Sequence, residues 1–191
     1  MGLTRKSLQE LEVSGKTGKE GTTFVAVGAS GKEYAVKLFK PKKSVARLKR
    51  EAEFLRVAAE RGVAPRMLGV NTEAKFIVME KLKETIVARM RGQEQLTDQQ
   101  QRRIVEIFET LDDARVLHND GNPLNLMVDN SDRIMVIDFG MAKTIDKKML
   151  KKRGPHPNVD LTLWQVRREL KKYGLGTPLL RKRYEQYQRQ K

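Results

Sequence analysis

Two neighbouring stretches of the chain decide its fold: "VLHNDGNPLNLMVDN", residues 116–130, and "RIMVIDFGMA", residues 133–142. Each contains a short apolar run, Leu126–Val128 in the first and Ile134–Ile137 in the second, of a length typical of strands. Polar residues that a strand interior rejects stand around these runs at fixed offsets. They are His118, Asp120, Asn125 and Asp138.

The chemistry of these polar side chains suits a single site. Asp120 is placed to accept the proton of an attacking hydroxyl, or to orient that hydroxyl. Asn125 and Asp138 carry hard oxygen ligands of the kind that magnesium prefers, and such ligands leave room for water and phosphate oxygens. A single Asp in such a place is often only a turn former. The whole set in this order is poorly explained by chance.

The first part of the chain predicts a small sheet with one helix. "TTFVAVGA" and "KEYAVKLFK" are typical of a hairpin, and two more strands are expected on either side of "NTEA". The stretch "KSVARLKREAEFLRVAAERG" has apolar residues at the helical period, with Ser44 as its N-cap and Gly62 as its stop.

The rest of the chain is more helical. "DQQQRRIVEIFETLDDA" predicts a helix that begins at Thr97 or Asp98, and "VDLTLWQVRRELKKYG" predicts one that ends at Gly174. "PLLRKRYEQYQRQK" predicts either a last helix or a frayed basic tail. The expected fold class is α+β, with a β-rich N-lobe over residues 1–82, a shortened helical C-lobe over residues 83–191, and a hinge near residues 81–84.

A lysine in the second strand needs explaining. Lys37 ends the apolar stretch "YAVK", where an ammonium group that points inward needs a compensating anion. Glu51 is the candidate partner, because it lies close to the apolar stripe of the helix, whereas Glu53 points roughly 160–200° away. The alternatives are that Lys37 faces solvent on the polar side of its strand and that Glu51 is an ordinary surface carboxylate.

A glycine-rich stretch precedes the first strand. "GKTGKEG" places Gly15, Gly18 and Gly21 at three-residue spacing, which lets backbone N–H groups approach phosphates closely. The phosphate-loop NTPase pattern needs a different glycine spacing and a helix afterwards, so that class is disfavoured. A flexible turn is the alternative interpretation.

Composition and charge narrow the choice of partners. The chain has 191 residues and no cysteine, which excludes disulfides and thiolate metal sites. No apolar run approaches the ~20 residues of a membrane span, and the first residues lack the core of a secretory signal, so a cytoplasmic location without membrane contact is expected. Of the formal net charge of +15, most lies in residues 143–191. This excess favours RNA, including tRNA, or an acidic protein surface; a solvated helical face is the alternative.

These motifs together resemble the protein-kinase signature over about residues 13–163: glycine-rich loop, strand lysine, helix glutamate, His-x-Asp-x4-Asn and Asp-Phe-Gly. Within that superfamily the chain resembles small atypical kinases. "TGKEG" is similar to the phosphate loop of RIO kinases. "KREAEFLRVAAERGVAPRMLGV" followed by "FIVMEKL" is similar to the kinase of the KEOPS complex, which takes part in tRNA modification. Asn119, Gly121 and the short interval from Gly140 to Asp160 depart from the usual patterns, so a long activation segment is not expected.

The resemblance implies that ATP and Mg²⁺ bind between the lobes. The nucleotide-binding residues would be Gly15, Gly18, Gly21, Lys37, Glu51, Met79, Glu80 and Leu82. The metal ligands would be Asn125 and Asp138, and the catalytic residues Asp120, Lys37 and Asn125. Met79 would gate the back of the nucleotide pocket. His118 and Asp160 are expected to brace the catalytic loop, Asp160 by accepting backbone N–H groups of that loop.

The implied function is that of an ATP-dependent phosphotransferase, first of all a Ser/Thr protein kinase that acts on a protein substrate and phosphorylates itself. The alternatives are an ATPase subunit of a tRNA-modification assembly, a small-molecule kinase of the aminoglycoside-kinase type, and a non-catalytic scaffold. The last is disfavoured because every catalytic position is filled. A viral kinase or a secreted bacterial effector, working in the host-cell cytoplasm, would have a similarly shortened chain.

Overall fold

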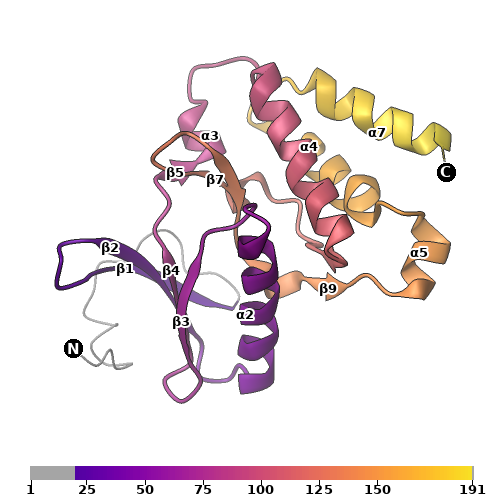
Figure 1. Ribbon diagram of the computed structural model, residues 1–191. Helices are drawn as coiled ribbons and strands as arrows, with labels where there is room; N and C mark the ends of the chain where they lie inside the picture. Colours follow the sequence, from indigo (N-terminus) through magenta and orange to yellow (C-terminus); the bar gives the residue numbers. More distant parts are fainter. Residues whose placement is uncertain (1–19, 191) are drawn as a thin grey trace.

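The N-terminal part of the protein is a four-stranded antiparallel sheet. The computed structural model describes residues 20–190 (Figure 1). The strands are β1 (Gly21–Val27), β2 (Glu33–Phe39), β3 (Met67–Asn71) and β4 (Phe76–Glu80), in the order β1-β2-β4-β3. The register places Lys37 of β2 between Thr23 of β1 and Ile77 of β4. The predicted hairpin and the strand pair around "NTEA" are therefore confirmed.

One long helix, α2 (Val45–Glu60), packs against this sheet (Figure 1). The side chain of Ser44 accepts a hydrogen bond from the N–H of Arg47, as an N-cap does. The helix ends before Gly62, whose positive φ of 68° suits glycine. Both predicted ends are thus confirmed. Along the buried face, the apolar residues are joined by a single acidic one, Glu51.

The chain then enters a mostly helical part. After β4 come β5 (Glu84–Thr85), α3 (Ile86–Arg89) and α4 (Asp98–Asp113). Thr97 caps α4 in a reciprocal capping box with Gln100, which decides between the two predicted caps. The strand β5 joins β7 (Leu126–Val128) and β8 (Ile134–Val136) in a three-stranded sheet. The two apolar runs that decide the fold are therefore neighbouring strands.

The remaining elements are one strand before the catalytic loop and the segments that follow the Asp-Phe-Gly motif. A short pair joins β6 (Val116–Leu117) to β9 (Lys143–Thr144), and α5 (Lys147–Arg153), α6 (Trp164–Lys172) and α7 (Pro178–Gln190) complete the fold. The predicted helix ending at Gly174 is interrupted, because its first turns form a π-helical segment, η3 (Asn158–Leu163), before α6 begins. The last segment is a helix, and its Tyr187 is buried.

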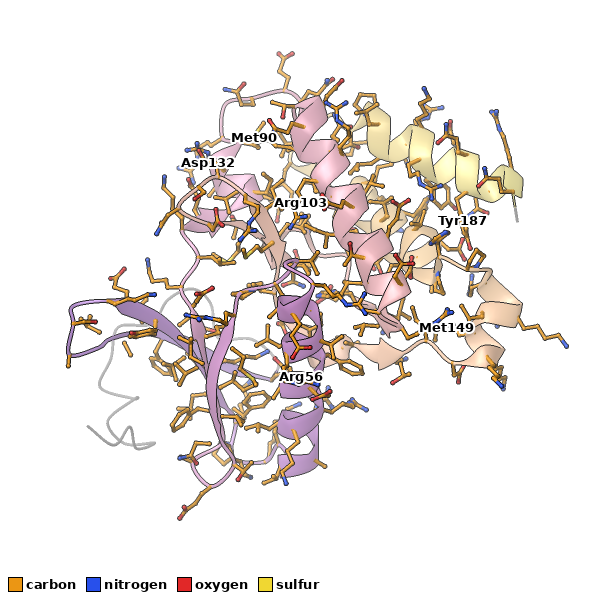
Figure 2. The ribbon with its side chains drawn as sticks, viewed as in Figure 1. Arg56, Met90, Arg103, Asp132, Met149 and Tyr187 are labelled. Atoms are coloured by element: carbon orange, nitrogen blue, oxygen red, sulfur yellow. The ribbon has the colours of Figure 1, made fainter. Side chains whose placement is uncertain are left out.

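A continuous core joins the sheet to the helical part. Its largest cluster includes Phe39, Leu48 and Ile77 on one side and Ile104 and Phe108 of α4 on the other. Arg103 of α4 adds polar ties by donating to the carbonyls of Gly62 and Ile134 (Figure 2). The mixed α+β class with a small β-rich N-terminal region and a helical C-terminal part is confirmed. Within residues 20–190, none of the helices has the length and apolar character needed to span a membrane.

Candidate active site

A cavity of about 540 Å³ lies between the N-terminal sheet and the C-terminal part. Most of the site residues that the sequence predicts line it: Gly21, Lys37, Glu51, Met79, Glu80, Leu82, Asn125 and Asp138. Asp120 does not line this cavity, although its Oδ2 accepts a hydrogen bond of 3.0 Å from Nδ2 of Asn125, which does. Gly15 and Gly18 lie outside the described residues. Residues from six separate parts of the chain are thus brought to one cavity.

Lys37 is the centre of a buried ionic cluster. Its Nζ lies 2.5 Å from Oε1 of Glu51 on α2 and 2.8 Å from Oδ1 of Asp138, which follows β8. Burial disfavours the ammonium form, but the two carboxylates outweigh burial and raise the pKa of Lys37. Lys37 therefore stays charged and faces inward, and Glu51 rather than Glu53 is its helix partner. Glu53 pairs with Arg56 on the surface.

The backbone at Asp138 is held in an unusual conformation. Its φ of 63° and ψ of 75° lie in the left-handed region, which non-glycine residues seldom occupy and which Lys75, Arg115, Asn119 and Asp132 also enter through a positive φ. Oδ1 of Asp138 also accepts a hydrogen bond from the N–H of Gly140. Burial opposes ionisation, yet the charge of Lys37 prevails and lowers the pKa of Asp138. Asp138 is thus an ionised carboxylate at neutral pH.

Acidic side chains crowd around Gly140. A Cβ at this position would come within 3.0 Å of Cγ of Glu20, 3.1 Å of Oδ1 of Asp138 and 3.3 Å of Oε2 of Glu51. The sequence reasoning did not assign Glu20, which is buried and pairs with Arg47 at 2.8 Å and Lys43 at 3.1 Å. The position of Glu20 between two glycines of "GKEG" was the only sign of such a role.

The loop between β6 and β7 holds Asp120 by short-range hydrogen bonds. Oδ1 of Asp120 accepts from the N–H of Asn122, and its Oδ2 accepts from Nδ2 of Asn125. His118 is fully buried, and its ring nitrogens lie 3.0 Å from the carbonyl oxygens of Asp120 and Ile137. Burial lowers the pKa of His118 and so favours the neutral imidazole. The expected bracing role of His118 is confirmed by these contacts.

Asn158, which the sequence reasoning missed, supports the same loop through hydrogen bonds. The backbone N–H of His118 donates to Oδ1 of Asn158 at 2.9 Å, and Nδ2 of Asn158 donates to the carbonyl of Val116 and to Oδ1 of Asp112. The side chain of Asp160 accepts hydrogen bonds from Arg153 and Gln188. Its expected contact with backbone N–H groups of the catalytic loop stays a prediction.

Asn158 is the first residue of the π-helical segment η3, in which hydrogen bonds join residues five apart in the chain. From this position its side chain reaches the catalytic loop at the N–H of His118. Its partner Asp112 is buried among amide donors, and Nδ1 of His156 lies 3.8 Å from its Oδ2. Burial therefore raises the pKa of Asp112 to about 7, although hydrogen bonds from Asn158 oppose the shift.

The wall of the cavity nearest β4 offers backbone groups. The carbonyl and N–H of Glu80 are occupied by strand pairing and by Arg66. In the described part of the chain, the N–H groups of Lys81 and Leu82 donate no backbone hydrogen bond, so they are available to a ligand. Met79 and the buried side chain of Leu82 supply apolar lining.

The protein oxygen atoms at the opposite wall can hold a magnesium ion only if a ligand supplies further oxygen atoms. Oδ2 of Asp138 and Oδ1 of Asn125 accept no hydrogen bond within residues 20–190, so both are free to coordinate. The same residues contain no group of three or more His, Cys, Asp or Glu suited to a metal. Magnesium commonly takes one or two protein oxygens and completes its shell with water and phosphate oxygens, which this pair allows.

Comparison with known proteins agrees with this geometry. The family model described as "Protein kinase domain" matches residues 11–159. That match covers the sheet, α2, the catalytic loop and the Asp-Phe-Gly motif, and it ends before α6 and α7. A search of curated proteins found no match.

Proposed function

The chain belongs to the protein kinase domain family, and from this premise we propose that it is an ATP- and magnesium-dependent Ser/Thr protein kinase that also phosphorylates itself. The family supports a phosphotransferase; the nature of the acceptor is our proposal. The observation that carries it is that Glu51, at 2.5 Å, and Asp138, at 2.8 Å, both contact Nζ of Lys37 at a cavity of nucleotide size.

We assign the two lobes to residues 1–82 and 83–191, with the crossing at residues 81–83. This division is supported by the change from a four-stranded sheet to helices at that point. Adenine would bond to the free backbone N–H groups of Lys81 and Leu82, with Met79 at the back. The glycines 15, 18 and 21 would cover the phosphates.

Lys37 would hold the α- and β-phosphates, and Glu51 would fix the direction of the ammonium group. Asp138 and Asn125 would hold magnesium, which supplies positive charge that offsets the charge of the phosphates. Both assignments depend on positioning and charge neutralisation, which are the main sources of rate in phosphoryl transfer.

Asp120 would orient the acceptor hydroxyl and take its proton. The hydroxyl oxygen forms a bond to the γ-phosphorus while the bond from that phosphorus to the β–γ bridging oxygen breaks. The products are the phosphorylated acceptor and ADP, and the proton leaves through the Asp120 carboxylate. The hydrogen bonds from Asn122 and Asn125 support this role because they fix both carboxylate oxygens.

A second candidate function is suggested by α5. Within residues 20–190, Lys147, Lys148, Lys151 and Lys152 form no ion pair, and the helix buries none of its residues. Such a basic surface directly after the Asp-Phe-Gly motif suits RNA, and with it an ATPase that works in a larger assembly.

The test is incubation of the purified protein with γ-labelled ATP and magnesium, with or without a generic protein substrate and with or without tRNA. Label on the added protein or on the chain itself is expected. Phosphate release stimulated by tRNA, without label on protein, would favour the ATPase instead. Absence of both would overturn the two candidates together.

Three variants make this test specific. Asp120→Asn should transfer phosphate about 10²-fold more slowly while it keeps nucleotide binding. Glu51→Gln should impair transfer, whereas Glu53→Gln should leave it unchanged because Glu53 bonds only to Arg56 on the surface. Equal effects of the two Glu variants would contradict the role given to Glu51.

A further inference from the structure

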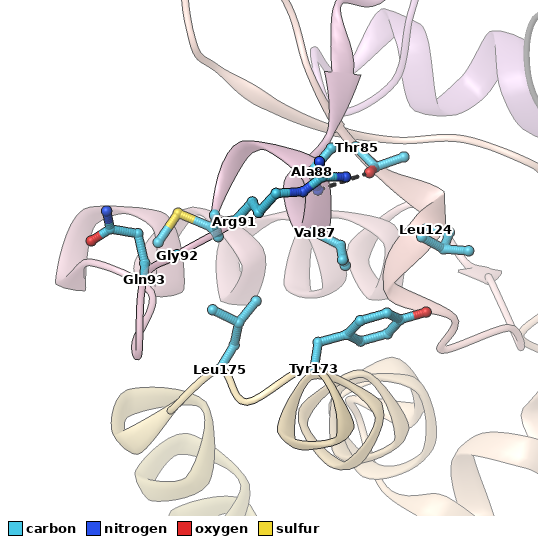
Figure 3. A pocket seen from close by; sticks show the side chains of 10 residues that line it. Thr85, Val87, Ala88, Arg91, Gly92, Gln93, Leu124, Tyr173 and Leu175 are labelled. Carbon is cyan, nitrogen blue, oxygen red and sulfur yellow. Dashed lines mark hydrogen bonds between the residues drawn. The ribbon is translucent and has the colours of Figure 1, made fainter.

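A second cavity, of about 460 Å³, adjoins the catalytic loop on the side of α3. Figure 3 shows its walls: Val87 and Arg91 come from α3 and the turn after it, Leu124 comes from the catalytic loop, and Tyr173 and Leu175 come from the turn after α6. Three segments far apart in the sequence therefore build one hollow. The assignments of the preceding subsection make no use of it.

This cavity shares a wall with the nucleotide cavity. Thr85, Ala88 and Leu124 line both. Leu124 stands in the chain between Asp120, which would receive the acceptor hydroxyl, and Asn125. A polypeptide that presents a hydroxyl to Asp120 would thus lie beside the opening formed by Leu124.

The walls are mostly apolar and partly exposed. The Leu124 and Tyr173 residues are 40% and 48% exposed, which is unusual for large apolar side chains, and Met90 and Leu175 form a buried floor. In Figure 3 the ring of Tyr173 lies beneath Val87 and beside Leu124. An apolar side chain placed here would remove all of these surfaces from water.

A single charge accompanies this apolar lining. Arg91 is exposed, and no carboxylate pairs with it in the described part of the chain. None of the ten lining residues is acidic. The cavity therefore complements a carboxylate and repels a polycationic acceptor such as an aminoglycoside. One cation among apolar walls is too few for a nucleic-acid backbone.

We infer that this cavity is the acceptor-specificity subsite, and this inference rests on the proposed function. It takes a large apolar side chain of the protein acceptor, near the Ser or Thr to be phosphorylated, with a neighbouring Asp or Glu paired to Arg91. Tyr173 and Arg91 are specificity-determining residues that touch the acceptor away from the reacting atoms.

The test is phosphorylation of a peptide library in which each pool fixes one residue at one position around a Ser or Thr. Wild-type protein should prefer pools with Leu, Met or Phe at one position and Asp or Glu at another. Tyr173→Ala should raise the KM for the best peptide about tenfold because apolar burial is lost, with kcat and the KM for ATP unchanged. Tyr173→Phe should retain the preference.

Charge reversal at Arg91 tests the expected preference for Asp or Glu in the peptide. Arg91→Glu should raise the KM for the acidic peptide about fivefold and shift the preference at that position to Lys or Arg. Arg61→Glu is the matched control, since Arg61 is exposed and lines neither cavity. Peptide phosphorylation that ignores both features, or transfer only to RNA or a small molecule, would overturn this subsite while phosphotransfer stands. No transfer by the wild-type protein to any acceptor would overturn both.

Discussion

Two buried polar clusters differ in how their charges are compensated. The cleft cluster, Lys37, Glu51 and Asp138, balances one ammonium group against two carboxylates at the edge of a cavity. The support cluster, Asp112, His118 and Asn158, has one carboxylate surrounded by amide donors. In the first, Lys37 lowers the pKa of Asp138; in the second, burial raises the pKa of Asp112 to about 7.

This difference suits the cleft cluster to a chemical role and the support cluster to a structural role. Ionised groups that face a cavity can exchange their partners for a charged ligand, so the cleft cluster should govern transfer. The support cluster is closed to ligands and connects α4, η3 and the catalytic loop, so it should govern stability and the position of Asp120. Each prediction below changes one cluster. It tests whether the change acts on phosphate transfer, as expected for the cleft cluster, or on stability and the position of Asp120, as expected for the support cluster.

The largest effect on rate is expected from Asp138→Ala. Loss of this carboxylate removes a proposed magnesium ligand, and transfer should fall by about 10²-fold or more. Some stability should also be lost, because Oδ1 of Asp138 pairs with Nζ of the buried Lys37 at 2.8 Å. Initial rates of labelled-phosphate transfer, together with thermal melting, test both halves. The control is Asp132→Ala, a surface carboxylate paired with Arg89 (Figure 2). An undiminished rate in Asp138→Ala would refute the assignment.

Lys37→Met should lose transfer and also stability. The substitution leaves the buried carboxylate of Glu51 without its cation, which should cost about 3 kcal/mol of unfolding free energy. The double variant Lys37→Met/Glu51→Gln removes the uncompensated charge, so it should recover most of that stability but none of the activity. Urea denaturation of the three proteins measures this. If the double variant is no more stable than the single one, the ion pair is not the source of the loss.

Asn158→Ala tests the support cluster. It leaves the N–H of His118, the carbonyl of Val116 and the carboxylate of Asp112 without a shared partner. Unsatisfied buried groups of this kind should lower the free energy of unfolding by about 2 kcal/mol. Transfer should fall through kcat rather than through the KM for ATP, since Asn158 lies outside the nucleotide cavity. A rise in the KM for ATP alone would contradict the division between clusters.

The cleft cluster could be predicted from the sequence, and most of the support cluster could not. Helical periodicity distinguished Glu51 from Glu53. Strand alternation left open whether Lys37 points inward or to solvent, and the resemblance to the protein-kinase signature favoured the inward direction. Asn158 carried no such signal, because its role depends on a π-helical turn that local pattern does not reveal.

Other elements escaped prediction for related reasons. The helix α5 has no apolar stripe, so no periodicity marked it. The acceptor-specificity subsite is assembled from residues 85–93, 124 and 173–175, which meet only in the folded chain. The strands and long helices were predictable because each buries one regular face, whereas these sites depend on how elements are placed relative to one another.

The smallest effect is expected from Asp112→Asn, and it appears as a change in pH dependence. The folded-state pKa of about 7 lies above the usual 3.8, so folding favours the protonated form. The stability that this proton contributes is complete below about pH 4 and is lost as the pH rises through about 7. The variant can keep the hydrogen bonds from Asn158 through its amide oxygen, and it has no proton to lose.

Denaturation at several pH values between 4 and 8 measures this difference directly. The free energy of unfolding of the wild type should fall with rising pH more steeply than that of Asp112→Asn, by at most the slope of one bound proton. Above pH 7 the variant should equal or exceed the wild type. Asp113→Asn, the exposed neighbour, should keep nearly the wild-type slope. Parallel curves for wild type and Asp112→Asn would mean that Asp112 is ionised throughout, and that both clusters carry compensated charge.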